Sequence, residues 1–231
     1  MLSIEGRKAI VTGVSKGIGY ATVKSLLDSG VHVVGWGRTS PEINHEKFHF
    51  IKTDVSNAEN VYSSFEQSQA LFDEPIDILI NNAGLGFDGK IEEMDDLQWK
   101  TMFDTNVHGV FFCSKAVIPG MKKAGIGHIV NIASIAGITG IQNMAGYCGT
   151  KFAVRGISHS MFKELRDFGI KVTCIYPGSV QTGFFDTISS VTANENMMQP
   201  EDIAETIVHC LQSSPNYHHI DIEVRPLKPK G

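Results

Sequence analysis

The sequence has little charge and no excess of positive charge. Charged residues make up 19% of its 231 residues, and 25 acidic against 20 basic side chains give a net charge of −5. Nucleic-acid-binding proteins usually carry a basic surface, so we expect no nucleic-acid partner. No apolar run approaches the roughly 20 residues of a membrane span, and residues 1–7 lack the apolar stretch of a signal peptide. These absences favour a cytoplasmic protein without a membrane partner.

Cysteine and histidine form no metal-binding pattern. Of the nine histidines only His218 and His219 are adjacent, and we interpret them as surface residues. Cys148 follows Tyr147 directly but has no evident base, so a packing role is expected. We predict no metal site and a reducing compartment. The cysteines are expected to be small buried residues: Cys113, Cys148, Cys174 and Cys210.

Apolar stretches of strand length recur along the chain. Hydrophobic residues make up 42% of the sequence, which indicates a globular core. Helical patterns, such as the one that begins at Pro200, separate most of the stretches. This alternation predicts an α/β protein with a doubly wound, mainly parallel seven-stranded sheet and helices on both faces, in a single domain over 1–231. The expected strands are residues 8–13, 31–36, 47–53, 76–82, 127–133, 170–176 and 220–225.

Three glycines follow the first expected strand. Gly13, Gly17 and Gly19 separate that strand from an apolar helical pattern through Leu26. Glycines permit a tight turn, and a phosphate can approach the backbone at a helix N-terminus, where N–H groups and the dipole favour an anion. An ordinary strand–helix turn could look the same, since Gly-x-x-x-Gly-x-Gly differs from the general dinucleotide motif. The turn is a candidate phosphate site of a Rossmann fold.

Tyr147 and Lys151 lie four residues apart, and Ser134 precedes Tyr147 by 13 residues. In a helix, two side chains at that spacing share one face. An ammonium beside a phenol favours the phenolate and would lower the phenol pKa from its usual value of about 10. Such a pair alone is more often a solvated helix face. Its meaning therefore depends on the other motifs.

Further motifs follow in chain order. The complete set is Thr12–Gly19, Asn81–Gly84, Asn106, Ser134, Tyr147, Lys151 and Pro177–Thr182. Together these motifs resemble those of the short-chain dehydrogenase/reductase family, and the resemblance covers essentially the whole chain. It implies an oxidoreductase that transfers a hydride between a nicotinamide cofactor and the carbonyl or secondary alcohol of a small molecule. The alternative is a nucleotide-binding regulatory protein of the same fold without turnover, which a degenerate catalytic set would indicate.

The resemblance implies roles for four catalytic residues. Tyr147 would be the general acid and base, and Lys151 would bind the nicotinamide ribose and lower the phenol pKa. Ser134 would hydrogen-bond the substrate oxygen, and Asn106 would hold a water that links Lys151 to solvent. Two structural alternatives remain open. A serine at a strand end is often a helix cap, and a helical asparagine often bonds nearby backbone.

The resemblance also implies the cofactor contacts. NAD-specific relatives carry an acidic residue at the end of the second strand, and Gly37 takes that place here. Arg38 follows, and Lys16 offers a second cation from the glycine turn, so we predict NADP(H). Either cation alone could be a solvated surface charge. The expected cofactor-binding residues are Thr12, Gly13, Ser15, Lys16, Gly17, Ile18, Gly19, Gly37, Arg38, Asp54, Val55, Asn82, Ala83, Gly84, Tyr147, Lys151, Pro177, Gly178, Val180 and Thr182.

Substrate identity in this family depends largely on the segment after Thr182. We interpret residues 183–199 as a short substrate lid. Met197 and Met198 line an apolar pocket or pack within the loop, and the sequence favours neither. Leu85–Phe87 departs from the corresponding segment of ketoacyl-carrier-protein reductases. The candidate lid residues are Phe184, Phe185, Ile188 and Val191.

Relatives pair through two long helices, which here span about 95–123 and 146–167. The resemblance thus predicts a homodimer or homotetramer. Ile157, Met161 and Leu165 form an apolar stripe that suits either this contact or packing on the chain's own sheet.

Overall fold

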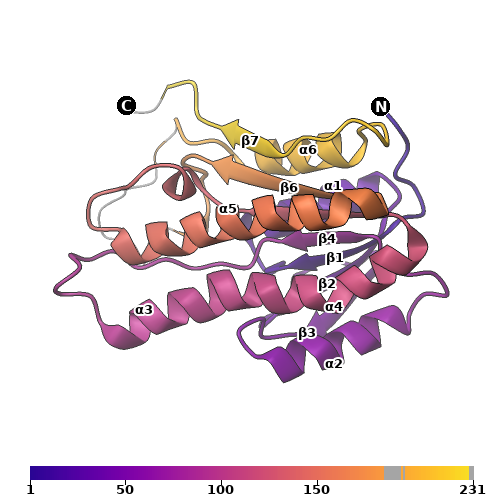
Figure 1. Cartoon of the computed structure of the whole chain (residues 1–231), viewed down its shortest axis with the longest axis horizontal. Helices are drawn as coiled ribbons and strands as arrows, with labels where there is room; N and C mark the ends of the chain where they lie inside the picture. Colours follow the sequence, from indigo (N-terminus) through magenta and orange to yellow (C-terminus); the bar gives the residue numbers. More distant parts are fainter. Residues whose placement is uncertain (185–193, 195, 229–231) are drawn as a thin grey trace.

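A seven-stranded parallel sheet forms the centre of the molecule (Figure 1). The computed structural model describes residues 1–184, 194 and 196–228. The strands are β1 (Lys8–Thr12), β2 (His32–Gly37), β3 (Phe48–Lys52), β4 (Ile78–Asn81), β5 (Gly127–Ile132), β6 (Ile170–Pro177) and β7 (Asp221–Val224). They lie in the order β3-β2-β1-β4-β5-β6-β7, and every pair is parallel. The predicted doubly wound sheet in one domain is confirmed.

Helices cover both faces of this sheet. They are α1 (Gly17–Asp28), α2 (Ala58–Gln69), α3 (Asp96–Phe103), α4 (Gly109–Ala124), α5 (Ala145–Leu165) and α6 (Pro200–Leu211), with a π-helical turn η1 (Asp104–His108) and short 3₁₀ turns η2 (Ile135–Gly137) and η3 (Arg166–Phe168). Consecutive β1 residues point to opposite faces. Val11 joins the cluster with α1 and α6, whereas Ile10 joins the cluster with α2, α4 and α5. Figure 1 shows α4 and α5 in front of the sheet.

The strand order reverses between β1 and β4. The chain runs outward from β1 to β2 and β3, then returns to place β4 on the other side of β1. Ligands of doubly wound sheets bind at the carboxyl ends of the strands beside such a reversal. Ile10 pairs with Leu79, so the residues that follow these two strands, including Gly13 and Asn82, meet at that edge.

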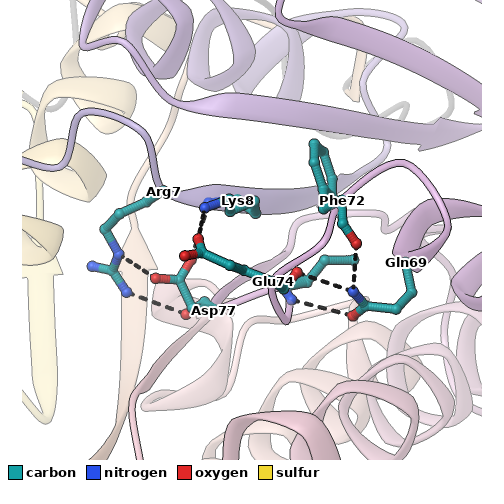
Figure 2. Close-up of polar contacts among 7 residues, drawn as sticks. Arg7, Lys8, Gln69, Phe72, Glu74 and Asp77 are labelled. Atoms are coloured by element: carbon teal, nitrogen blue, oxygen red, sulfur yellow. Dashed lines mark hydrogen bonds and ion pairs between the residues drawn. The ribbon is translucent and has the colours of Figure 1, made fainter. Parts of the chain in front are cut away.

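Polar contacts fix the opposite edge, where β1 and β4 begin (Figure 2). Arg7 Nε donates to Asp77 Oδ2 at 2.7 Å, and the Lys8 backbone N donates to Asp77 Oδ1 at 3.1 Å. The Lys8 ammonium pairs with Glu74, whose carbonyl accepts from Gln69 Nε2 at 3.0 Å. The connection from α2 to β4 is thereby tied to the start of β1. These contacts align the two strands that border the reversal.

The cysteines and histidines of the described residues agree only in part with expectation. All four cysteines are buried and free, as predicted, and no group of side chains there could hold a metal ion. His218 and His219 were expected at the surface. Both are instead partly buried, and His218 Nε2 contacts the Val172 carbonyl at 2.9 Å, because the segment before β7 folds back against β6. Within the described residues, none of the helices has the length and apolarity that a bilayer crossing requires.

Candidate active site

A cavity of about 660 Å³ lies at the carboxyl ends of the strands. Its walls come from the turn between β1 and α1, the ends of β2 to β6, and α5. Most of the site residues predicted from the sequence line this cavity. They are Gly13, Ser15, Lys16, Gly17, Ile18, Gly37, Arg38, Asp54, Val55, Asn82, Ala83, Gly84, Ser134, Tyr147, Lys151, Pro177, Gly178, Val180 and Thr182. The fold therefore brings together motifs that span most of the chain.

Thr12 and Gly19 were also predicted from the sequence, but they lie behind the residues that line the cavity. Thr12 Oγ1 accepts hydrogen bonds from the backbone N of Asn82 at 3.0 Å and of Ala83 at 2.9 Å. A Cβ on Gly19 would lie 2.2 Å from the Gly13 carbonyl oxygen. The structure thus explains both residues by the close approach of β1, α1 and the chain after β4.

Asn106 also lies behind the lining, in the π-helical turn η1. Its Oδ1 accepts from Leu85 N at 2.9 Å, and its Nδ2 donates to Leu85 O at 2.8 Å and to Thr150 Oγ1 at 3.0 Å. A Cβ on Gly84 would lie 3.3 Å from Asn106 Oδ1 and 3.6 Å from Lys151 Nζ. The Asn106 amide therefore holds the loop at Leu85, which is distant in sequence, beside Lys151. It does not bond the nearby helix backbone.

The turn before α1 fits an anionic phosphate. The N-cap residue of α1, Lys16, makes no side-chain cap hydrogen bond, and the first turn contains no acidic residue. Gly13 and Gly17 have φ values of +72° and +61°, which favour glycine. A Cβ on Gly17 would approach Thr182 Cγ2 to 3.1 Å. The N–H groups at this helix end face a cavity that side chains leave open, as a dinucleotide pyrophosphate requires.

The end of β2 presents a cation to the cavity. Gly37 is buried, and the exposed Arg38 follows it on the cavity wall. Among the described lining residues the one carboxylate is Asp54, and its Oδ1 accepts from the Ser56 N and Oγ at 3.0 and 2.7 Å. Lys16 Nζ lies 3.5 Å from the Gly183 carbonyl on the opposite wall. Positive charge therefore predominates at this end.

Tyr147, Lys151 and Ser134 all line the cavity. Lys151 Nζ donates to the Ile132 carbonyl at 2.9 Å and lies 5.6 Å from the centroid of the Tyr147 ring. Ser134 accepts from Ala136 N at 3.1 Å and so caps η2, which is the structural role left open above. Its hydroxyl also lies close enough to the Tyr147 phenol to lower the pKa of that phenol. The cap and the contact with the phenol are thus compatible.

Burial dominates the acid–base properties of the pair. It raises the pKa of Tyr147 above the usual value, and the nearby Ser134 hydroxyl acts in the opposite direction. Burial also lowers the pKa of Lys151 from 10.5 to about 8. The sequence predicted a lowered phenol pKa through Lys151. The structure differs because the Lys151 ammonium bonds the Ile132 carbonyl and Tyr147 is buried, with 7% of its surface exposed.

We expect Lys151→Met to be more stable than the wild type at pH 7. A shift from 10.5 to about 8 means that burying the ammonium disfavours folding. Each pKa unit corresponds to about 1.36 kcal/mol, and loss of the hydrogen bond to Ile132 costs about 1 kcal/mol. The free energy of unfolding of Lys151→Met should therefore exceed that of the wild type by about 2 kcal/mol. This destabilisation of the wild type by the buried ammonium is fully present below pH 8. It decreases as pH rises from 8 toward 10.5, because in that range Lys151 is protonated only in the unfolded chain.

Urea unfolding at pH 7 and pH 10 measures this difference. The gap between Lys151→Met and wild type should narrow at pH 10. Lys163→Met, at an exposed position of the same helix, is the matched control and should show no comparable gain. Equal or lower stability of Lys151→Met at pH 7 would contradict the prediction.

Several lining residues had no sequence signal. They are Leu85, Thr101, Thr105, Ile135, Ile141 and Met144. The expected lid residue Phe184 lines the cavity, with its ring centroid 5.2 Å from that of Tyr147. The candidates Phe185, Ile188 and Val191 lie outside the described residues.

Met197 and Met198 do not line the cavity. Met197 is buried, and Met198 bridges to Val180 and packs against the core cluster of α1 and α6. The open question about these methionines is therefore answered in favour of packing.

Comparison with known proteins agrees with this geometry. Residues 7–192 match the profile of the family described as short chain dehydrogenase. The chain therefore belongs to the short-chain dehydrogenase/reductase family, whose members are oxidoreductases that act on small molecules. It is 35% identical over 234 residues to an uncharacterized oxidoreductase of Staphylococcus haemolyticus, with 98% of this chain and 100% of the relative covered.

Solved structures extend the comparison to bound cofactors. A 3-ketoacyl-(acyl-carrier-protein) reductase from Brucella melitensis complexed with NADH has a TM-score of 0.90 and 25% identity, covering 99% of this chain and 100% of that one. An alcohol dehydrogenase from the archaeon Thermococcus sibiricus complexed with 5-hydroxy-NADP has a TM-score of 0.88 and 25% identity, covering 98% and 100%. These neighbours support a nicotinamide cofactor for this chain.

Proposed function

We propose that the protein is an NADP(H)-dependent oxidoreductase that interconverts a carbonyl and a secondary alcohol on a small molecule, with Tyr147 as the general acid and base. One observation carries the proposal. The phenol of Tyr147, the hydroxyl of Ser134 and the ammonium of Lys151 lie on the same cavity as the open N-terminus of α1. A cavity with both features can hold a dinucleotide and a reacting carbonyl together.

The residues have separate tasks in this proposal. The bound nicotinamide supplies a hydride in one direction and accepts it in the other. Tyr147 donates a proton to the carbonyl oxygen, or removes it from the alcohol, and Ser134 holds that oxygen beside the phenol. Lys151 binds the ribose hydroxyls and places its charge near the phenol. Asn106 holds the loop at Leu85 and, with an ordered water, connects Lys151 to solvent.

Cofactor choice follows from charge at the end of β2. Arg38 and Lys16 bind the 2′-phosphate of NADP(H), and Gly37 stands where an acidic side chain would repel it. The lining and local geometry described above support this assignment. Residues 183–199 act as the substrate lid, and the protein works in the cytoplasm.

A panel of ketones, aldehydes and secondary alcohols, each assayed with NADPH or NADP⁺, tests the function. We expect turnover with at least one carbonyl substrate and its alcohol, and higher kcat/KM with NADP(H) than with NAD(H). Tight cofactor binding without turnover on any substrate would instead favour the regulatory nucleotide-binding protein. Equal or better efficiency with NADH would contradict the cofactor assignment.

We also propose a homodimer or homotetramer that pairs through α4 and α5. Large apolar side chains on this side remain exposed, including Phe111 at 49% and Phe152 at 43%. Light scattering at micromolar concentration should give a mass of two or four chains, and Phe152→Asp should reduce it. A monomer mass for the wild-type protein would exclude this assembly.

A further inference from the structure

Apolar side chains surround the phenol of Tyr147. Leu85, Met144 and Phe184 belong to the same hydrophobic cluster as Tyr147 and also line the cavity. Ile135 and Ile141 also line the cavity, and Ser134 is a polar neighbour of the phenol. A carbonyl presented to Tyr147 and Ser134 therefore has hydrocarbon around the rest of its molecule.

Phe184 packs against the Tyr147 ring in this wall. Its ring is tilted by 49° to the Tyr147 ring at a centroid distance of 5.2 Å. A Cβ on Gly86 would come within 2.7 Å of Phe184 Cζ and 3.1 Å of Tyr147 Cδ2. The glycine thus allows the phenylalanine to approach the phenol. A substrate group beside the reacting carbonyl would lie against this ring.

The described lining contains three basic side chains, those of Lys16, Arg38 and Lys151. Arg38 follows β2, and Lys16 precedes α1, with its Nζ 3.5 Å from the Gly183 carbonyl. In the proposed function the 2′-phosphate of NADP(H) pairs with both cations. Lys151 is 5% exposed, and its ammonium donates to the Ile132 carbonyl. Carboxylate and phosphate groups lose much hydration energy on burial unless a cation or several donors replace the water.

The neighbouring loops supply no such cation. Residues 135–144 contain no charged side chain, and residues 179–200 contain no Lys, Arg or His, so neither segment brings positive charge wherever its side chains lie. Between residues 85 and 95 the one basic residue is Lys90, which is exposed and pairs with Glu93 at 2.9 Å. With Lys16 and Arg38 paired with the cofactor phosphate, an anionic substrate would therefore meet no counter-charge beyond Lys151.

We propose that the substrate is an uncharged, mainly apolar ketone or aldehyde, or the corresponding alcohol, and that Phe184 determines this preference. The inference rests on the proposed function. It excludes 2-oxo acids and amino acids. One of the solved neighbours, a serine dehydrogenase, is named for such a substrate. On this inference the chain shares the fold of that neighbour but takes a different class of substrate.

A matched pair of ketones tests the substrate class. In 5-methyl-2-hexanone an isopropyl group takes the place of the carboxylate of 4-oxopentanoate, at nearly equal size. With saturating NADPH, kcat/KM for the neutral ketone should exceed that for the anionic one by about 100-fold or more, mainly through KM. Equal or higher efficiency with 4-oxopentanoate would overturn the inference and leave the proposed function intact. Failure of the whole ketone and aldehyde panel would overturn both.

A charge at position 184 tests the role of Phe184. Phe184→Arg should raise kcat/KM for 4-oxopentanoate relative to 5-methyl-2-hexanone by at least about tenfold, because the guanidinium supplies the missing partner. Phe184→Leu keeps an apolar wall and should retain the wild-type preference. NADPH affinity, measured by fluorescence titration, should be similar in all three proteins. An unchanged preference in a Phe184→Arg protein that binds NADPH would exclude the role of this residue.

Discussion

Tyr147→Phe is expected to lower kcat for the best carbonyl substrate by about 10²- to 10⁴-fold, the usual contribution of a general acid or base. The substitution removes one hydroxyl and keeps the ring. That ring packs in a cluster with Met102, Ala136 and Met144, so the fold and cofactor affinity should remain largely unchanged. Single-turnover kinetics with bound NADPH measures the chemical step directly.

The matched control is Tyr62→Phe, which removes the same hydroxyl from α2, far from the cavity lining. It should retain wild-type turnover. If Tyr147→Phe also kept near-wild-type turnover with the best substrate, another group would have to move the proton. Folding of each variant can be checked by circular dichroism and urea unfolding.

Arg38→Ala is expected to weaken NADPH binding by about 10- to 100-fold, because a hydrogen bond to a charged group contributes about 1.5–3 kcal/mol. Arg38 is exposed on the cavity wall, and within the described part of the chain no side chain or backbone group pairs with it. NADH lacks the phosphate, so its binding should hardly change. The Kd values of both cofactors, measured by fluorescence, give the comparison.

Arg166→Ala is a suitable control because it removes an arginine from η3, outside the cavity lining. Its affinity for both cofactors should match that of the wild type. A similar loss of NADH and NADPH affinity in Arg38→Ala would mean that Arg38 contacts the adenine or its ribose, which the two cofactors share.

The sheet could be predicted from the sequence because each strand of a two-sided parallel sheet is a short continuous apolar run. Residues 8–13 and 127–133 were expected as strands, and β1 and β5 occupy Lys8–Thr12 and Gly127–Ile132. The glycine turn was equally visible, because close backbone approach leaves few alternatives to glycine. Both patterns follow from requirements of the backbone, so they can be recognised in a single sequence.

The substrate side of the cavity could not be predicted in this way. Leu85, Ile141 and Met144 come from irregular segments, whose apolar residues follow no helical or strand period. The spacing of Tyr147 and Lys151 correctly placed them on one helix face. It could not indicate that the ammonium bonds the Ile132 carbonyl, because that contact depends on how α5 packs against β5.

The π-helical turn that contains Asn106 has a consequence for how this chain can vary in length. A π turn adds a residue to an otherwise continuous α-helix from Asp96 to Ala124. Each residue advances an α-helix by about 100°, so the faces on either side of the turn are out of phase by that angle. Met102 can then face the cluster around Tyr147 while Cys113 faces the sheet. A one-residue deletion within 104–108 would bring the two faces back into phase and turn the Asn106 amide away from Leu85. The helix should therefore tolerate many substitutions better than the deletion of a single residue.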